Sequence, residues 1–356
     1  MKKTEALKQI AFHKKGFDGF LIFNWANLLY FAGFPGAASL LIPRDGESTI
    51  YVYGVNYEQA KAEGRGFGVA LVKRDENLMA KIAEKVKDYK IKKLAVDALS
   101  IEGWRALAKE TRGETKLKVK GNFVWELRKV KDEEEVALMR KAGELTSEGM
   151  KTAYEALTPG MKEYEVAAEI EYAMRKRGSY GTAFETSVAS GPRSAFPHGG
   201  CSDREIREGD LVVVDFGATY KFYRSDMTRT LVVGKPSEKQ KKLYQIVKAA
   251  QEKAFEIIKP NVKAKNVDAA ARKTIEDAGY GEYFVHGLGH GVGLEVHEPP
   301  TLNSSSKETL AVGNVVTDEP GIYLVGYGGV RIEDTVLVRK NGAEKLTKGL
   351  YALGSE

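Results

Sequence analysis

Short apolar runs alternate with amphipathic segments along the first third of the chain. Segments near residues 5–15, 55–63 and 77–89 have the spacing of helices, and the runs between and around them have the composition of strands. Arg44-Asp45-Gly46, between two of the runs, has the composition of a hairpin turn. This alternation predicts an α/β sheet domain over residues 1–120. The predicted strands are 19–23, 39–43, 49–53, 69–72 and 93–97.

The pattern changes after residue 131 to long amphipathic helices. Asp132 and Glu135 form a capping box at the start of a helix that is expected to end near Ala156, and a second helix is expected at 162–177. Two predicted strands, 211–215 and 225–233, follow. The order then repeats, with helices near 237–259 and 266–278 and a second pair of strands. We therefore expect an α+β protein, with a linker at 121–131 and a duplicated helix, helix, hairpin unit over 132–356.

Composition narrows the class of protein. The chain has 356 residues, of which 43% are hydrophobic and 29% charged, as in soluble globular proteins. It has no apolar run long enough to span a membrane and no signal-peptide core at its N-terminus, so a cytoplasmic protein with no membrane partner is expected. The single cysteine, Cys201, excludes internal disulfides and thiolate metal sites. Any metal must then be bound by His, Asp and Glu.

The net charge of +6 arises in the first third of the chain. Residues 1–120 contain 22 basic and 14 acidic side chains, whereas the remainder contains 33 and 35. The lysines alternate with acids and form no compact basic stripe interleaved with aromatics, so nucleic acid is not an expected partner.

Histidines and glycines concentrate between residues 286 and 297. Three of the five histidines of the chain, His286, His290 and His297, lie there, and Glu319 and Glu333 follow on predicted strands. The glycines at 287, 289, 291 and 293 alternate, which is not the dinucleotide-binding spacing. Alternate glycines in a strand predict that a ligand or a second backbone approaches closely. The whole stretch indicates a metal site.

Two predicted hairpins carry pairs of carboxylates. Asp215 and Asp226 are symmetric about residues 220–221, and Glu319 and Glu333 about Gly326, so each pair is expected to lie directly across its hairpin at about 5 Å. Buried like charges are costly, and a divalent cation would remove the conflict. A catalytic zinc ion takes three protein ligands and a water, so four carboxylates and one imidazole are too many for one zinc site. They suit two metals about 4 Å apart. Mn, Co, Zn and Fe(II) all fit such donors.

The ordered motifs Phe-Pro-His198-Gly, Gly-His290-Gly-Val-Gly, Val-His297-Glu, Glu319-Pro-Gly and Val-Arg331-Ile-Glu333-Asp resemble the pita-bread metallopeptidases. The similarity is to the branch of Xaa-Pro dipeptidases (prolidases) and Xaa-Pro aminopeptidases, and it covers the whole chain. It implies a creatinase/prolidase-like N-terminal domain and a pita-bread catalytic domain. The implied activity is that of a dinuclear-metal exopeptidase in which a metal-bridging hydroxide attacks the carbonyl before proline.

The resemblance also implies roles for individual residues. Asp226 and Glu333 would bridge the two metals, and Glu319 would accept a proton during catalysis. His198 and His297 would line the substrate pocket and take part in catalysis, and Arg331 would orient the carboxylates. His286 is a candidate for substrate contact, with a structural role as the alternative. The implied substrates are proline-containing dipeptides or short peptides, the implied assembly is a homodimer, and the implied metal ligands are Asp215, Asp226, His290, Glu319 and Glu333.

Two departures from the branch bear on substrate specificity and on the metal site, respectively. Residues 299–312 contain Lys307 but no arginine, whereas dipeptidases of the branch usually carry one there that binds the substrate carboxylate. An Xaa-Pro aminopeptidase acting on longer peptides is therefore the alternative. Asp318 also stands where an apolar residue is usual, which would place an extra carboxylate beside the site and either raise metal affinity or perturb Glu319. A more remote alternative is a non-catalytic binding module of the same fold, which is disfavoured because all the expected ligands are present.

Overall fold

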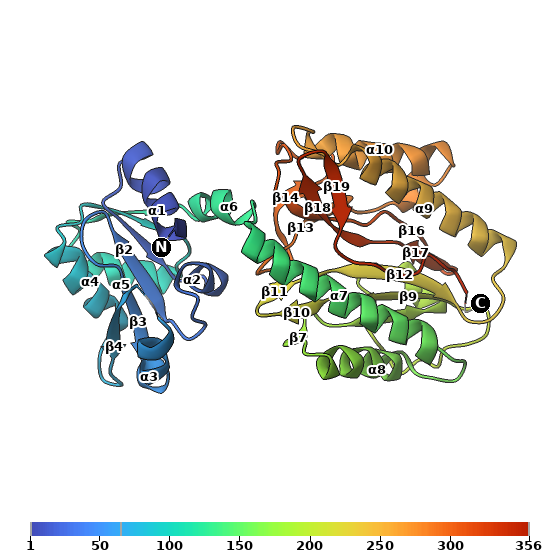
Figure 1. Ribbon diagram of the computed structural model, residues 1–356, viewed down its shortest axis with the longest axis horizontal. Helices are drawn as coiled ribbons and strands as arrows, with labels where there is room; N and C mark the ends of the chain where they lie inside the picture. Colours follow the sequence, from blue (N-terminus) through green and yellow to red (C-terminus); the bar gives the residue numbers. More distant parts are fainter. Residues whose placement is uncertain (1, 65, 355–356) are drawn as a thin grey trace. The chain divides into compact units, whose positions relative to one another are not determined.

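The computed structural model describes residues 2–64 and 66–354. The chain divides into two compact units, Met1–Arg128 and Lys129–Glu356. Each has its own sheets and helices (Figure 1) and is described by itself.

The first unit is built on a six-stranded mixed sheet with the order β4-β3-β2-β1-β5-β6. In its centre, β1 (Gly19–Ile22) pairs antiparallel with β2 (Ser39–Pro43) and parallel with β5 (Lys93–Val96). Leu21 packs against α4 and α5 on one face, whereas Phe20 contacts the Phe123 ring of α6. The other elements are β3 (Thr49–Tyr53), β4 (Gly68–Val72), β6 (Lys116–Val119), α1 (Lys2–Lys8), the π-helix η1 (Gln9–Lys14), α2 (Trp25–Ala32), α3 (Gly54–Glu63), α4 (Leu78–Asp88), α5 (Ile101–Glu110) and α6 (Asn122–Arg128).

All five strands predicted in this unit are present, each within one residue of its predicted ends. The predicted turn at 44–46 joins β2 to β3, and Gly46 has the positive φ of +108° that such a turn requires. The helix expected over 5–15 instead begins at Lys2 and continues as η1.

Four elements of the first unit were not predicted: α2, α5, β6 and α6, which lies within the segment 121–131 that was expected to be a linker. Helix α2 is buried at every residue except Trp25, so it lacks the polar face that makes a helix visible in sequence. Its ends nevertheless carry ordinary signals, since the Asn24 side chain caps its N-terminus and Gly33 ends it with φ +66°. Strand β6 is a four-residue edge strand in which Lys116 and Lys118 alternate with Leu117 and Val119, so it contains no continuous apolar run.

The second unit contains two pairs of packed helices, each followed by antiparallel strands. The pairs are α7 (Glu133–Ala156) with α8 (Glu163–Lys176), and α9 (Glu238–Ile257) with α10 (Ala264–Asp277). Capping boxes at Asp132 and Ser237 begin the first helix of each pair. The strands between the helix pairs complete the predicted duplicated helix, helix, hairpin architecture, which is confirmed (Figure 1).

Equivalent strands occupy equivalent places in the two halves. The first half has the order β12-β9-β8, and the second half has β14-β13-β15-β18-β19, in which β13, β15 and β18 correspond to β8, β9 and β12. The bounds are β7 (Gly181–Thr182), β8 (Ser187–Ser190), η2 (Gly191–Ala195), β9 (Leu211–Phe216), β10 (Ala218–Tyr220), β11 (Tyr223–Arg224), β12 (Met227–Val232), η3 (Gly281–Tyr283), β13 (Gly289–Gly291), β14 (Glu298–Leu302), β15 (Val315–Asp318), β16 (Gly321–Leu324), β17 (Gly328–Arg331), β18 (Asp334–Arg339) and β19 (Gly342–Lys345).

The predicted register of the first hairpin is wrong. Asp215 pairs with Thr228 rather than with Asp226. The turn lies at Lys221 and Phe222, whose φ angles of 44° and 72° are both positive, as in a type I′ turn. Because this turn is centred one residue later than expected, every pairing shifts by two residues, and the two aspartates are diagonal neighbours.

The predicted register of the second hairpin is confirmed. Asp318 pairs with Asp334 and Gly321 with Arg331, so that Glu319 and Glu333 occupy matching positions between these pairs. Gly326 lies in the turn with φ +81°.

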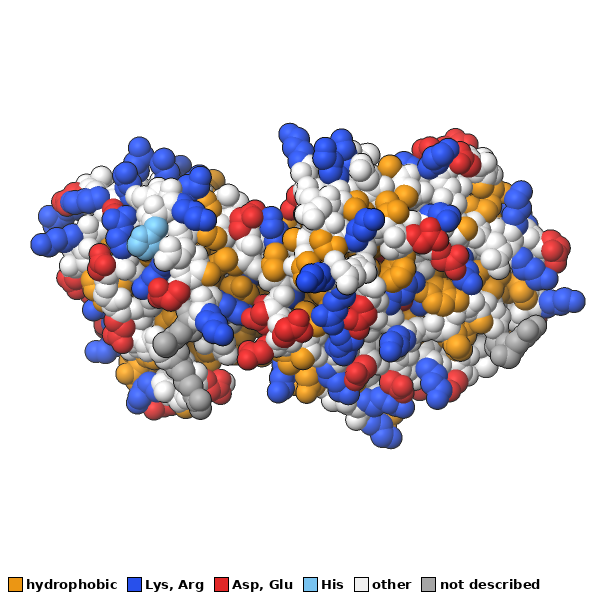
Figure 2. Space-filling view, turned by 45° about the horizontal axis from the view of Figure 1, so that its top comes forward, with side chains coloured by type: hydrophobic (Ala, Val, Ile, Leu, Met, Phe, Trp, Pro, Cys, Tyr) orange, Lys and Arg blue, Asp and Glu red, His pale blue; other side chains and the backbone are white. Residues whose placement is uncertain are grey.

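Charged side chains of both signs are interspersed on the face of each unit that Figure 2 shows. Many pair along the helices, for example Lys273 with Asp277 on α10. Within the described ranges, every helix is too short or too polar to cross a bilayer.

Candidate metal centre and active site

A cavity of about 510 Å³ in the second unit gathers the candidate residues from both halves of the duplication. It lies where the ends of β9, β12 and β13 meet the β16–β17 hairpin. All nine predicted site residues line it: His198, Asp215, Asp226, His286, His290, His297, Glu319, Arg331 and Glu333.

Asp226, His290 and Glu333 form the tightest group of possible metal ligands. One ligand atom from each lies within 4.8 Å of the others. Asp226 directly precedes β12, and Glu333 directly precedes β18, so the carboxylates come from equivalent strands of the two halves. Both are almost fully buried.

The glycines beside His290 allow β13 to fit between β14 and β15. A Cβ atom at Gly289 would lie 2.3 Å from the Thr317 carbonyl oxygen, and one at Gly291 would lie 2.4 Å from that of Pro299. The predicted close approach of a second backbone is therefore confirmed. It brings the His290 imidazole into the cavity.

Glu319 lies beside His290. Its Oε1 atom is 3.2 Å from His290 Nε2 and accepts a hydrogen bond of 3.0 Å from the Thr317 hydroxyl. The same hydroxyl accepts a hydrogen bond from the His290 backbone amide. Thr317 therefore fixes the imidazole and the carboxylate relative to each other.

Asp215 contacts Arg331, which comes from the other half of the unit. Arg331 Nη2 donates to Asp215 Oδ2 at 2.6 Å, while Nη1 donates to the Tyr323 hydroxyl and Nε to the Thr228 hydroxyl. Asp215 Oδ1 is buried without a hydrogen-bond partner among the described residues. One oxygen of this carboxylate is thus held in place, and the other is free to bind a ligand.

The cavity holds more negative charge than its surroundings stabilise. Burial raises the pKa of Asp226 and Glu333 well above the ordinary range, and the neighbouring carboxylates raise it further. Burial also raises the pKa of Asp215, although Arg331 opposes the shift. Burial alone would raise the pKa of Glu319 as well, but its contact with His290 outweighs this and lowers the pKa to about 2.

These donors fit divalent metal ions. A cation stabilises the ionised form of buried carboxylates, and the buried Oδ1 atom of Asp215 is an unused ligand atom. Carboxylate oxygens with one imidazole are common ligands of divalent first-row metals. Such an ion would replace the direct contact between His290 and Glu319, because both would bind it instead.

His286 has protein partners at both ring nitrogens. Nδ1 lies 2.7 Å from the Gly287 carbonyl oxygen and therefore donates, whereas Nε2 lies 2.9 Å from the Tyr323 hydroxyl and accepts from it. Burial lowers the pKa of His286, which favours this neutral form. The ring lines the cavity and also belongs to a chain of contacts that continues through Tyr323 to Arg331 and Asp215.

His198 and His297 are the more exposed histidines of the cavity. His198 lies on the loop after η2, and His297 immediately precedes β14. The ring centroids of His297 and His290 are 4.2 Å apart. Burial and the charge of His290 lower the pKa of His297.

Three residues that hold the site together were not predicted: Thr228, Thr317 and Tyr323. Each contacts a candidate ligand or its partner through a hydroxyl group. Their positions in strands gave only a weak signal, because threonine and tyrosine are common in any strand.

Comparison with known proteins agrees with this geometry. The model of metallopeptidase family M24 matches residues 137–340, and that of the creatinase/prolidase N-terminal domain matches residues 6–130. An Xaa-Pro dipeptidase of Pyrococcus furiosus is 43% identical over 93% of each chain. The solved structure of an Xaa-Pro dipeptidase from Bacillus anthracis has a TM-score of 0.94 at 38% identity over 99% of each chain. That of an X-Pro aminopeptidase from Thermotoga maritima has a TM-score of 0.88 at 39% identity, over 96% of this chain and 99% of that one. The chain belongs to metallopeptidase family M24, a family of metal-dependent hydrolases, and its first unit is a creatinase/prolidase N-terminal domain.

Proposed function

We propose that this protein is an Xaa-Pro dipeptidase that hydrolyses the bond before a C-terminal proline. The observation that carries the proposal is the single cavity that joins the carboxylate and imidazole cluster to His198 and His297. Full-length similarity to Xaa-Pro dipeptidases supports the same activity.

In this proposal the cluster holds two divalent ions, drawn from Mn, Co, Zn and Fe(II). Asp226, Glu333, Asp215, His290 and Glu319 would hold these ions. When bound, such ions polarise the scissile carbonyl and lower the pKa of a water molecule. The protein supplies the geometry, since Arg331 holds Asp215 and Thr317 holds Glu319.

The remaining polar groups act on the peptide. Glu319, whose carboxylate lies 3.2 Å from His290 beside the cluster, would accept the proton of the attacking water. His198 and His297 face the cavity from its more exposed side, where an imidazole can donate a hydrogen bond to the developing oxyanion or protonate the leaving imino nitrogen.

The second candidate is an Xaa-Pro aminopeptidase that acts on longer peptides. Thr301 and Asn303, from the segment without arginine, line the cavity with neutral side chains. This segment thus supplies no guanidinium to pair with the carboxylate of a dipeptide. The similarity to an X-Pro aminopeptidase points the same way.

Substrate length separates the two candidates. We expect the Mn²⁺-loaded enzyme to hydrolyse an Xaa-Pro dipeptide with a higher kcat/KM than the matching Xaa-Pro-Xaa tripeptide. Equal or faster hydrolysis of the tripeptide would establish the aminopeptidase instead. Cleavage of neither peptide would exclude both, and Asp226→Asn serves as the control that assigns the cleavage to this cavity.

We further propose a cytoplasmic homodimer, in keeping with the family resemblance. Light scattering coupled to size exclusion measures the assembly, and fractionation of the source cells measures the location. Elemental analysis of protein purified from those cells identifies the metal.

A further inference from the structure

We propose that Asp334 is a positioning residue of the metal centre. Through the buried Arg229 it fixes the main chain of Glu333 and keeps this residue aligned with Asp226, which directly precedes β12. The inference rests on the proposed function only in taking Asp226 and Glu333 as metal ligands.

The two half-sites meet along a junction made mainly by threonine side chains. The Thr335 hydroxyl donates to the Asp226 carbonyl oxygen at 2.7 Å and accepts from the Asp226 amide at 2.9 Å. The Glu333 amide donates to the Thr228 carbonyl oxygen at 3.0 Å, and the Thr228 hydroxyl donates to Glu333 Oε2 at 2.6 Å. The relative position of the two carboxylates therefore depends on a few contacts rather than on a regular ladder.

The buried side chain of Arg229 also connects the two sides of this junction. It has no exposed surface. Nη1 donates to the carbonyl oxygens of Glu333 at 2.7 Å and Thr228 at 2.9 Å, and Nε donates to that of Leu350 at 3.0 Å. One guanidinium thus holds the main chains of both strands.

Asp334 is the anion that keeps Arg229 in this position. Arg229 Nη2 donates to Asp334 Oδ1 at 3.0 Å, and both side chains are fully buried. A buried guanidinium requires a buried counter-charge, and a carboxylate also matches its geometry. Asp334 is next to Glu333 in sequence, so loss of the ion pair would act directly on the main chain that carries the ligand.

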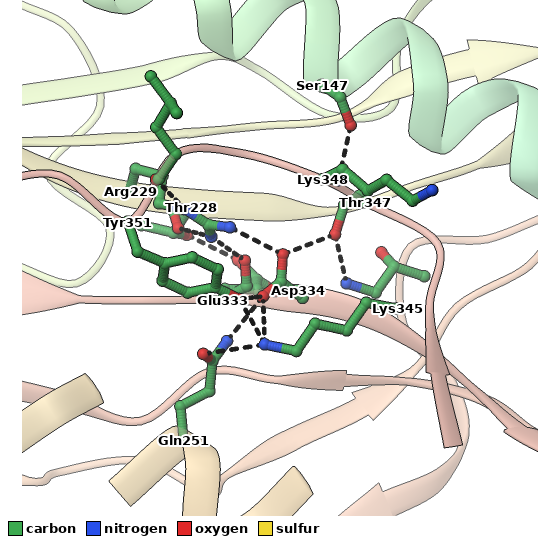
Figure 3. A network of polar contacts seen from close by, with 12 residues as sticks. Ser147, Thr228, Arg229, Gln251, Glu333, Asp334, Lys345, Thr347, Lys348 and Tyr351 are labelled. Atoms are coloured by element: carbon green, nitrogen blue, oxygen red, sulfur yellow. Dashed lines mark hydrogen bonds and ion pairs between the residues drawn. The ribbon is translucent and has the colours of Figure 1, made fainter. Parts of the chain in front are cut away.

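Four further donors converge on Asp334 from other elements (Figure 3). Oδ1 accepts from the Thr347 hydroxyl at 2.9 Å, and Oδ2 accepts from Gln251 of α9 at 3.0 Å and from Lys345 of β19 at 2.9 Å. The Tyr351 hydroxyl also donates to Oδ2. Asp334 is thereby held from several sides, which makes it a rigid support for Arg229.

The test is calorimetric titration of the chelated full-length protein with Mn²⁺, which does not depend on peptidase activity. Asp334→Asn and Arg229→Lys are each expected to raise the Kd for Mn²⁺ by about 10- to 100-fold. Arg229→Lys keeps the positive charge and loses only the fork that holds two strands, so it isolates geometry from charge. Unchanged affinity in either variant overturns the proposal, as does a parent protein that does not bind Mn²⁺.

Two controls separate positioning from other effects. Asp97 of the first unit is likewise buried and accepts hydrogen bonds from Phe23, Asn24 and Asn27, so Asp97→Asn is expected to lower Tm and leave the Kd unchanged. An equal loss of Mn²⁺ affinity in Asp97→Asn would assign the effect to general instability and overturn the proposal. Asp334→Asn leaves the Lys345 ammonium without its carboxylate partner, and the additional change Lys345→Met removes this positive charge. Recovery of affinity in this double variant would make the effect purely electrostatic and contradict positioning.

Discussion

Arg331 on β17 donates a hydrogen bond of 2.6 Å to Asp215 on β9, which joins the two halves of the duplicated unit at the metal centre. The guanidinium is buried and also donates to the hydroxyls of Tyr323 and Thr228. It therefore fixes the direction of one carboxylate while it offsets part of the negative charge of the cavity.

Arg331→Lys is expected to reduce Mn²⁺ affinity by about 10- to 100-fold, because an ammonium cannot contact Asp215, Tyr323 and Thr228 together as the guanidinium does. Calorimetric titration measures the change. Arg339→Lys is the matched control, since Arg339 pairs with Glu344 nearer the surface. Equal affinities of the two variants would show that the fork geometry of Arg331 is not needed.

Gly291→Ala is expected to destabilise the protein by about 1 to 3 kcal/mol through overpacking, because the new Cβ atom would lie 2.4 Å from the Pro299 carbonyl oxygen. Denaturant unfolding of the metal-free protein measures the loss. Gly54→Ala is the control, since that position has open space and an ordinary φ. The close approach of β13 and β14 would be refuted by equal stability of the two variants.

Asp318 is expected to make stability fall as pH rises. It is fully buried, and neither carboxylate oxygen has a hydrogen-bond partner among the described residues. Burial raises its pKa well above 3.8, so between 3.8 and the raised pKa the unfolded chain ionises while the folded one stays protonated. The contribution of Asp318 to the free energy of unfolding is therefore complete below pH 3.8. Above this pH it falls by about 1.4 kcal/mol per pH unit, up to the raised pKa.

Asp318→Asn tests this sign. The free energy of unfolding of the metal-free variant, relative to the parent, should be higher at about pH 7 than at about pH 5. Denaturant titration at both pH values measures the difference. If the difference in free energy of unfolding between variant and parent stays constant with pH, Asp318 ionises equally in the folded and unfolded states.

Asp226→Asn is expected to lose more than about 100-fold in Mn²⁺ affinity, since a ligand contributes more than the residues that support it. The fold should persist, because Thr335 bonds to the main chain of Asp226 and not to its side chain. Circular dichroism and calorimetry of one preparation measure both properties. Asp277→Asn on the surface of α10 is the control, and loss of the native spectrum in Asp226→Asn alone would contradict the expectation.

The sequence contained most of the architecture, because capping residues and apolar spacing act locally. Asp132 and Glu135 begin α7 as expected, and the second hairpin has the predicted register because Gly326 supports its turn. The turn of the first hairpin was predicted one residue too early, because Lys221 and Phe222 form a positive-φ turn without glycine or asparagine. Local composition gave no sign of that turn.

The candidate site was predictable to the extent that its chemistry is unusual. Histidines and carboxylates in glycine-rich or apolar strands stand out, and all of those singled out line one cavity. The supporting hydroxyls of Thr228 and Tyr323 did not stand out. Their role depends on contacts with residues about 100 positions away for Thr228 and on the depth of burial for Tyr323, neither of which is visible in a linear sequence.

The central claim is that hydrolysis before proline requires metal bound by both halves of the duplicated unit. The most direct measurement is the rate of Xaa-Pro dipeptide hydrolysis as chelated protein is titrated with Mn²⁺. We expect no activity without metal, a rise that saturates at two ions per chain, and no rise in Asp226→Asn. Full activity in the chelated protein would contradict the account.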